Sequence, residues 1–98
     1  MIRGALPIRI FRVAERSMEP TIKEGDYVIL LMWIWKLRRG DVVVLKHPSK
    51  NKNLIKRISQ LNENNIYVVG DNRDLSEDSR KFGFVNKELI VGKVLFKV

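Results

Sequence analysis

The apolar residues of this chain fall into short, β-branched runs, and helical stripes are rare. Two near-continuous runs, residues 27–31 and 42–45, each follow a turn in which a charged residue precedes Gly-Asp. Short continuous apolar runs are typical of strands that are covered on both faces. The pattern therefore predicts two buried strands, introduced by matching turns at residues 24–26 and 39–41.

The remaining apolar residues alternate more loosely with polar ones, which is typical of half-buried strands. Polar turn residues at 61–65 separate two such runs and predict a hairpin. Gly92 interrupts the last run and indicates a bulge. The further predicted strands are residues 8–13, 54–60, 66–69 and 89–96.

Polar segments connect these runs. Residues 48–53 form a short polar loop, and residues 70–83 form a long one, which in a compact domain is usually functional. Only residues 86–89 have the pattern of a helical turn. We therefore expect a mainly β protein, with six or seven short strands in a small barrel-like or folded β-sheet, and one domain over residues 1–98.

Composition narrows the function classes. The 98 residues contain 45% hydrophobic residues, as a globular domain does, and no cysteine, which excludes disulfides and thiolate chemistry. The net charge of +8 suits an acidic partner or, equally, a solvated surface. No nucleic-acid motif and no metal-ligand spacing appears, so we expect no bound nucleic acid, metal or cofactor.

Membrane segments are not expected. Arginines interrupt the N-terminal residues 1–14, and the apolar run at residues 27–35 is too short to span a bilayer as a helix. These features predict a cytoplasmic protein. Trp33 and Trp35 would share one face of a strand beside basic residues, which fits peripheral contact with a membrane and, equally, a core cap or a dimer contact.

Ser17 is the candidate nucleophile, because it lies between a strand and a turn stiffened by Pro20, where a side chain can be held exposed and fixed. A serine hydroxyl attacks a carbonyl only when a neighbouring base takes its proton. Lys56 is one candidate, since burial and the adjacent Arg57 would favour a neutral amine, although a solvent-facing lysine is the commoner reading of that segment alone. His47 is interpreted as an exposed loop residue.

These segments together resemble the signal peptidase I family, the S26 peptidases, whose members are endopeptidases with a serine/lysine dyad. The similarity spans residues 13–94. It implies that Ser17 is the acylated nucleophile, that Lys56 is its general base, and that the fold is the β catalytic core of the signal peptidase type. The segments that carry it, in the family's order, are Ser-Met-Glu-Pro-Thr at 17–21, Gly-Asp-Val-Val-Val at 40–44, Lys-Arg at 56–57, and residues 70–83.

The same resemblance assigns roles in the long loop. Ser76 matches the family serine that hydrogen-bonds and orients the lysine. Asp78 and Arg80 match an ion pair that braces the site. The start of the loop suits a tight turn that presents it to the site. The residues of this turn are Gly70, Asp71 and Asn72.

Three features depart from the family pattern. Two positions before the nucleophile, the family often has serine, threonine or glycine for the oxyanion hole. Here that position is Glu15, whose carboxylate would repel a developing oxyanion if it pointed inward. The membrane anchors and the large accessory domain of many bacterial members are also missing, which predicts a minimal catalytic core.

The predicted function is removal of an N-terminal leader from a precursor protein. Size and the C-terminal sequence are similar to the maturation proteases of nickel-type superoxide dismutase, which makes that precursor a candidate client. One alternative is removal of signal peptides with a separate membrane anchor. Alternatives of another class are a non-catalytic basic β-domain that binds nucleic acid, and an inactive scaffold.

Overall fold

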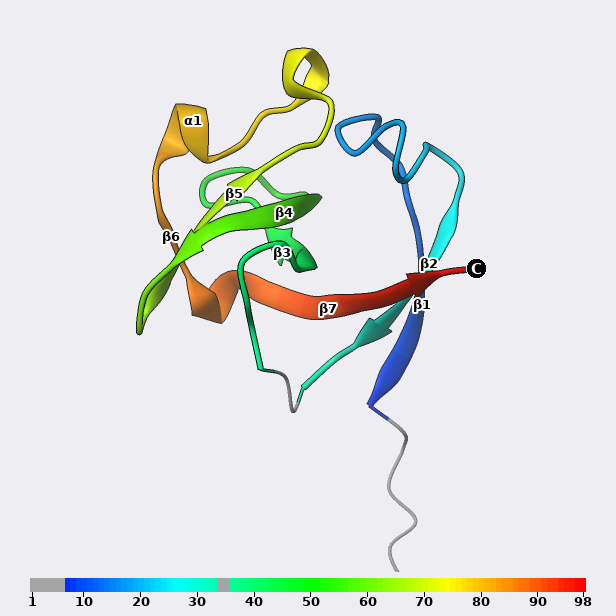
Figure 1. Ribbon diagram of the computed structural model, residues 1–98, viewed down its shortest axis with the longest axis horizontal. Helices are drawn as coiled ribbons and strands as arrows, with labels where there is room; N and C mark the ends of the chain where they lie inside the picture. Colours follow the sequence, from blue (N-terminus) through cyan, green and yellow to red (C-terminus); the bar gives the residue numbers. More distant parts are fainter. Residues whose placement is uncertain (1–6, 34–35) are drawn as a thin grey trace, which may run out of the picture.

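A computed structural model describes residues 7–33 and 36–98 of the chain. Its strands form one antiparallel sheet in the order β1-β2-β7-β3-β4-β5-β6 (Figure 1). The strands are β1 (Ile8–Arg12), β2 (Tyr27–Leu31), β3 (Val42–Lys46), β4 (Asn53–Leu61), β5 (Asn65–Val69), β6 (Val85–Asn86) and β7 (Ile90–Lys97). The short helical turns are η1 (Arg73–Leu75), α1 (Ser79–Phe82) and η2 (Lys87–Leu89).

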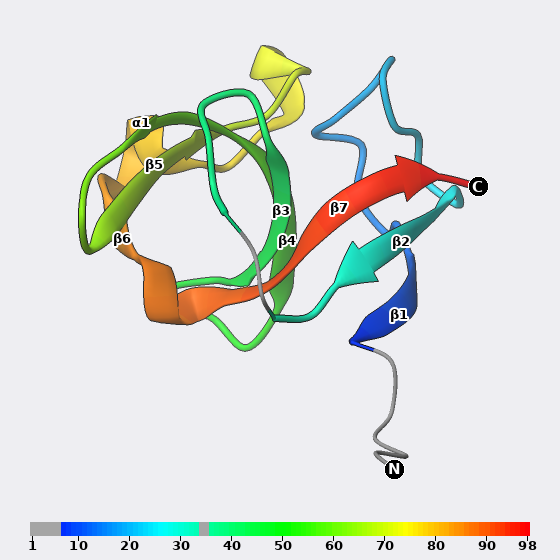
Figure 2. The ribbon, with the colours of Figure 1, turned by 60° about the horizontal axis from the view of Figure 1, so that its bottom comes forward.

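The sheet curls into a half-barrel. Figure 2 shows β3, β4, β5 and β6 wrapping around one side, while β1, β2 and the end of β7 extend away from it. The prediction of a mainly β, barrel-like fold is confirmed.

Strand β3 separates two hydrophobic cores. Val43 and Leu45 point into the core inside the half-barrel, and Val44 between them points into a second core beneath β2. Alternate residues of a strand face opposite sides, so a run that is buried on both faces must be apolar throughout. The prediction of burial on both faces is therefore confirmed for β3.

Strand β2 differs from this prediction. Val28 and Leu30 are buried, but Tyr27 on the other face is 48% exposed. On the face that carries Tyr27, Ile29 and Leu31 are only half-buried, so this face of β2 is less covered than the other.

The two Gly-Asp turns use the same local structure. Gly25 and Gly40 have φ angles of 91° and 94°, a left-handed conformation that glycine adopts readily. The following Asp26 and Asp41 each accept a hydrogen bond of 2.8 Å from the backbone N–H three residues earlier. The repeated sequence therefore produces a repeated turn, as predicted.

One local prediction needs correction, and two others are confirmed. The loop at residues 70–83 contains η1 and α1, which are too short to show a helical period. The register of β3 against β7 shifts between the pairs Val44–Gly92 and Leu45–Ile90, so the irregularity lies beside Gly92. The helical turn predicted at residues 86–89 is present as η2.

Candidate active site

Ser17 lies in the loop between β1 and β2 and is 1% exposed. The prediction of an exposed nucleophile was therefore wrong. The neighbouring Met18 is fully buried in the second core and draws the loop inward. The backbone carbonyl of Ser17 accepts a hydrogen bond of 2.7 Å from the N–H of Asn72, which fixes this loop against the one that follows β5.

Lys56 lies in the middle of β4 and is also 1% exposed. Its neighbour Ile55 belongs to the second core, next to the loop of Ser17. Burial of a lysine is costly unless the ammonium has a partner. The Lys56 Nζ donates a hydrogen bond of 2.6 Å to Glu15 Oε1. The predicted desolvation of Lys56 is confirmed, and its partner is a carboxylate.

Glu15 joins the nucleophile to the lysine. The same Oε1 atom that binds Lys56 also accepts a hydrogen bond from the Ser17 hydroxyl. Ser17 Oγ lies in addition 3.3 Å from the carbonyl oxygen of Ile55. The carboxylate at this unusual position therefore points into the site, and the link between Ser17 and Lys56 in this structure runs through it.

Gly70 provides the close approach between the two loops. A side-chain carbon at this position would lie 2.6 Å from the backbone oxygen of Ser17 and would collide with the side chain of Ser76. Only glycine fits between these groups. The turn predicted at residues 70–72 thus brings the long loop against Ser17.

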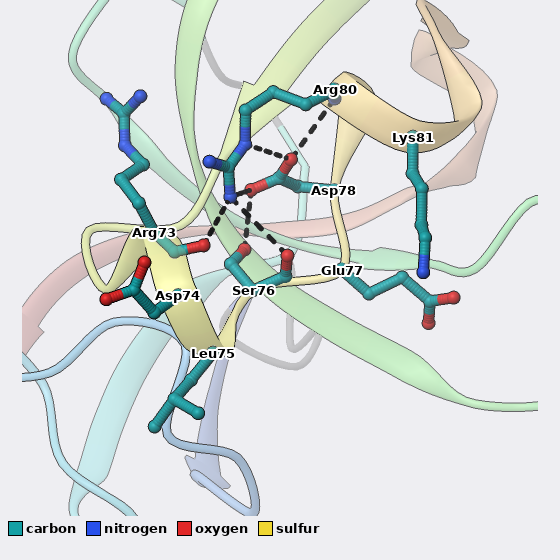
Figure 3. Close-up of a pocket in the computed structure, with 8 residues that line it drawn as sticks. All are labelled: Arg73, Asp74, Leu75, Ser76, Glu77, Asp78, Arg80 and Lys81. Atoms are coloured by element: carbon teal, nitrogen blue, oxygen red, sulfur yellow. Dashed lines mark hydrogen bonds and ion pairs between the residues drawn. The ribbon is translucent and has the colours of Figure 1, made fainter.

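Asp78 organises that loop. Its carboxylate accepts hydrogen bonds from Ser76 Oγ at 2.6 Å, from the Gly70 N–H at 2.9 Å, and from Arg80 Nε at 2.9 Å (Figure 3). The predicted pair of Asp78 and Arg80 is present. Because Ser76 donates to Asp78 here, an orienting role toward Lys56 stays a prediction.

The charge state of Asp78 follows from these contacts. Burial by itself would raise the pKa of this carboxyl group, but the hydrogen bonds from Arg80, Ser76 and two backbone amides outweigh it and lower the pKa to about 2. Asp78 is therefore ionised at neutral pH, and it is 1% exposed.

Asp71 has a structural partner on β4. Arg57 donates two hydrogen bonds to its carboxylate, at 2.9 and 2.8 Å, and one of 2.7 Å to the carbonyl of Gly40. Hydrogen bonding from Arg57 and from Thr21 holds the pKa of Asp71 below its usual range. Thr21, the last residue of the motif at 17–21, therefore contacts a carboxylate 50 positions later in the sequence.

His47 is buried, with 7% exposed, and the prediction of an exposed loop residue was wrong. Its Nδ1 accepts hydrogen bonds of 3.0 Å from the N–H groups of Ser49 and Lys50, and its ring packs edge-to-face on Phe82 at 5.3 Å. Its Nε2 lies 3.3 Å from Glu77 Oε1. These contacts give His47 a structural role in the turn between β3 and β4.

Glu77 connects that turn to the long loop. It pairs with Lys50 at 2.9 Å and with Lys52 at 3.2 Å. Hydrogen bonds from these two lysines lower the pKa of Glu77 to about 2.

Two pockets flank the site. One, of about 260 Å³, opens beside Glu15 and is lined by Phe11, Ala14, Glu15, Lys52, Asn53 and Ile55. The other, of about 470 Å³, lies over the polar loop drawn in Figure 3. In the described part of the chain, no group of three or more His, Cys, Asp or Glu side chains is placed to hold a metal ion.

Comparisons with known proteins show the family. The profile of the family described as signal peptidase, peptidase S26 matches residues 1–62 and 59–98. The chain belongs to the signal peptidase S26 family.

Relatives with known names support this assignment. The chain is 32% identical to mitochondrial inner membrane protease subunit 1 of Mus musculus, over 84% of this chain and 64% of that protein. It is 26% identical to signal peptidase IB of Staphylococcus aureus, over 98% of this chain and 80% of that protein. The chain thus spans 64% of the length of the mitochondrial relative.

The strand face predicted for the two tryptophans can be compared with the structure only at Trp33. Trp33 follows the end of β2 at a bend and is 51% exposed, whereas Trp35 lies outside the described residues. Within residues 7–33 and 36–98, no helix is long and apolar enough to cross a membrane.

Proposed function

We propose that this protein is a serine endopeptidase that removes an N-terminal leader from a precursor protein, with Ser17 as nucleophile and Lys56 as general base. The observation that carries this proposal is that Ser17 and the buried Lys56, 39 positions apart by their numbers, converge on one carboxylate oxygen in the fold of a peptidase family. The names of the relatives, a mitochondrial inner membrane protease subunit and a signal peptidase, support it.

The reaction proceeds in two acyl-transfer steps. The Ser17 hydroxyl attacks the scissile carbonyl carbon and gives its proton to the neutral Lys56 amine. The resulting ammonium then donates that proton to the leaving amine of the substrate. Water, deprotonated by Lys56, hydrolyses the acyl-enzyme. Backbone N–H groups around Ser17 would stabilise the oxyanion, and a developing charge gains most from fixed donors of this kind.

The long loop acts as the support of this site. Gly70 and Asn72 hold the Ser17 backbone, and Asp78 with Arg80 holds Gly70 and Ser76. An extended substrate strand would lie along the pocket beside Glu15, where residues of β4 and the segment after β1 face each other.

The client is proposed from the resemblance. The precursor of nickel-type superoxide dismutase is the first candidate, and exported proteins with signal peptides are the second. A peripheral membrane contact through Trp33 and Trp35 remains a prediction for either client.

The test is co-expression of the protein with each candidate precursor, followed by intact-mass measurement of the precursor. Wild type should yield one shortened product, while Ser17→Ala and Lys56→Ala should leave the precursor whole. Because the Lys56 side chain is buried, Lys56→Met is added as a variant of similar shape, with circular dichroism to confirm folding. Ser49→Ala and Lys46→Ala are the matched controls, since both residues are exposed.

The possible outcomes distinguish the proposed dyad from the non-catalytic alternatives. Cleavage that persists in folded Lys56→Met would show that another group is the base. If wild type cuts neither class of precursor, the binding readings gain support, and salt-dependent binding to DNA or RNA that Ser17→Ala leaves unchanged would favour the basic β-domain.

A further inference from the structure

We propose that Glu15 is an inhibitory member of the site, which holds Ser17 and Lys56 in a resting arrangement and must release both before catalysis. This inference rests on the proposed function and extends it. It concerns a residue type that the family pattern does not supply at this position.

The first argument is the sharing of one oxygen atom. Glu15 Oε1 accepts from the Ser17 hydroxyl and from Lys56 Nζ, the latter at 2.6 Å. A general base must lie within hydrogen-bond reach of the proton that it removes. In this arrangement the Ser17 hydroxyl and the Lys56 amine both donate to the Glu15 carboxylate, so the hydroxyl proton is not directed at Lys56.

The second argument concerns charge. A nearby carboxylate favours the charged form of an amine. An ammonium group has no lone pair, so a Lys56 that is paired with Glu15 is not ready to accept the serine proton. A carboxylate two residues before the nucleophile would also repel the oxyanion that forms at the scissile carbonyl.

The third argument is that Glu15 has room to leave. Its side chain is 27% exposed, unlike that of Lys56 at 1%, and it lines the pocket of about 260 Å³ where an extended substrate would bind. Lys52, whose side chain is 48% exposed, lines the same pocket.

The other charged groups near this pair are already matched in the described part of the chain. Lys52 pairs with Glu77, and Asp78, which lies behind Gly70 and Ser76, pairs with Arg80. Of these ion pairs, the pair of Glu15 and Lys56 is the one that includes a residue of the proposed dyad.

Activation then requires two changes. Lys56 loses one proton to solvent and becomes a neutral amine, and the Glu15 carboxylate rotates into the pocket. The Ser17 hydroxyl can then bond to the Lys56 Nζ directly. Attack forms the bond between Ser17 Oγ and the carbonyl carbon, while the hydroxyl proton moves to Lys56. A bound substrate strand would favour this state by occupying the space between Glu15 and Ser17.

The experiment compares wild type with Glu15→Gln and Glu15→Ala over a range of pH. Glu63→Gln removes the same charge from the exposed turn between β4 and β5 and serves as the control. Acetylation of Ser17 by p-nitrophenyl acetate, measured by intact mass and absent in Ser17→Ala, reports the reactivity of the nucleophile without a precursor.

A second readout follows the lysine itself. The protein is labelled with carbon-13 lysine, and the Lys56 signal is assigned by its loss in Lys56→Met. We expect the Lys56 signal in Glu15→Gln to differ from that in wild type at neutral pH, because its carboxylate partner is gone. Ser17 acetylation should be faster in Glu15→Gln than in wild type, and Glu63→Gln should change neither readout.

Two results would overturn the inference. If the Lys56 signal is the same in wild type and in Glu15→Gln, Glu15 does not hold the lysine. If both Glu15 variants lose acetylation at every pH, Glu15 itself takes the serine proton and is required. Failure of the proposed function looks different: no variant would then show acetylation that depends on Ser17, while the Lys56 signal would still differ between wild type and Glu15→Gln.

Discussion

Gly70 lies directly against the backbone of Ser17. A side-chain carbon on Gly70 would stand 2.6 Å from the Ser17 carbonyl oxygen, far inside van der Waals contact. The two residues belong to different loops, and the hydrogen bond from the Asn72 N–H to the same oxygen holds them together. The position of the proposed nucleophile thus depends on a glycine 53 residues later in the numbering.

Gly70→Ala should displace Ser17 and Ser76. We expect the free energy of unfolding to fall by about 1–3 kcal/mol, as in other overpacked sites, and precursor cleavage to be lost. Urea unfolding and the cleavage assay measure the two effects.

Gly40→Ala is the control for that change. Its φ of 94° disfavours alanine, but no atom lies within 4 Å of the added carbon. Its free energy of unfolding should fall by roughly 1–2 kcal/mol through backbone strain alone, and its cleavage rate should equal that of wild type. Equal loss of cleavage in the two variants would argue against a specific contact between Gly70 and Ser17.

Asp78→Asn should destabilise the protein by about 2 kcal/mol at neutral pH, because the buried carboxylate has several hydrogen-bond donors. Its pKa in the folded protein is about 2, below the value of about 3.9 expected for an unfolded chain. The stabilisation is therefore present above about pH 4 and is lost as the pH falls toward 2.

Urea unfolding of wild type and Asp78→Asn at several pH values tests this dependence. The difference between their free energies of unfolding should shrink as the pH falls from about 4 to about 2. Asp74→Asn, in the exposed part of the same loop, should follow wild type throughout. A constant difference across this range would mean that Asp78 contributes through packing alone.

Arg57→Lys should lower stability by about 1 kcal/mol although the charge is kept. The guanidinium group makes two parallel bonds to Asp71 and a third to the Gly40 carbonyl, which one ammonium group cannot reproduce. Chemical unfolding measures this loss. Arg9→Lys on the exposed strand β1 should leave stability unchanged. A similar loss of stability in both variants would rule out the bidentate pair as the cause.

Glu77→Gln should loosen the turn between β3 and β4. Glu77 pairs with Lys50 and Lys52 and lies beside His47. We expect faster amide hydrogen exchange in residues 47–53, and the same effect in wild type at high salt, because exposed ion pairs are screened. The pKa of Glu77 is lowered to about 2, so the effect should vanish as the pH falls from about 4 toward 2. Glu63→Gln should leave exchange in this turn unchanged.

The strands could be predicted from local sequence. Residues 27–31 and 42–45 are strands because β-branched runs with Gly-Asp turns strongly favour extended structure, and the structure has them as β2 and as most of β3. The hairpin of β4 and β5 follows equally from its polar turn. The candidate residues Ser17 and Lys56 were identified from motif order, and the fold brings them into one site.

Burial and contacts across the chain were harder to predict. Ser17 and His47 were expected to be exposed because each stands beside a turn, but the surrounding core residues draw both inward. The two short helical turns in the long loop were missed because three or four residues are too few for a helical period.

The sequence by itself determined the β class, the turns, the family and the pair of residues proposed for catalysis, because these depend on local periodicity and on motif order. Tertiary structure alone decided that β3 divides two cores, that β2 is less covered on one face, and that Gly70 meets Ser17. It also placed Glu15 between Ser17 and Lys56, a contact across 41 positions. Such contacts depend on how the sheet curls and on the volume of packed side chains, and no local pattern records either.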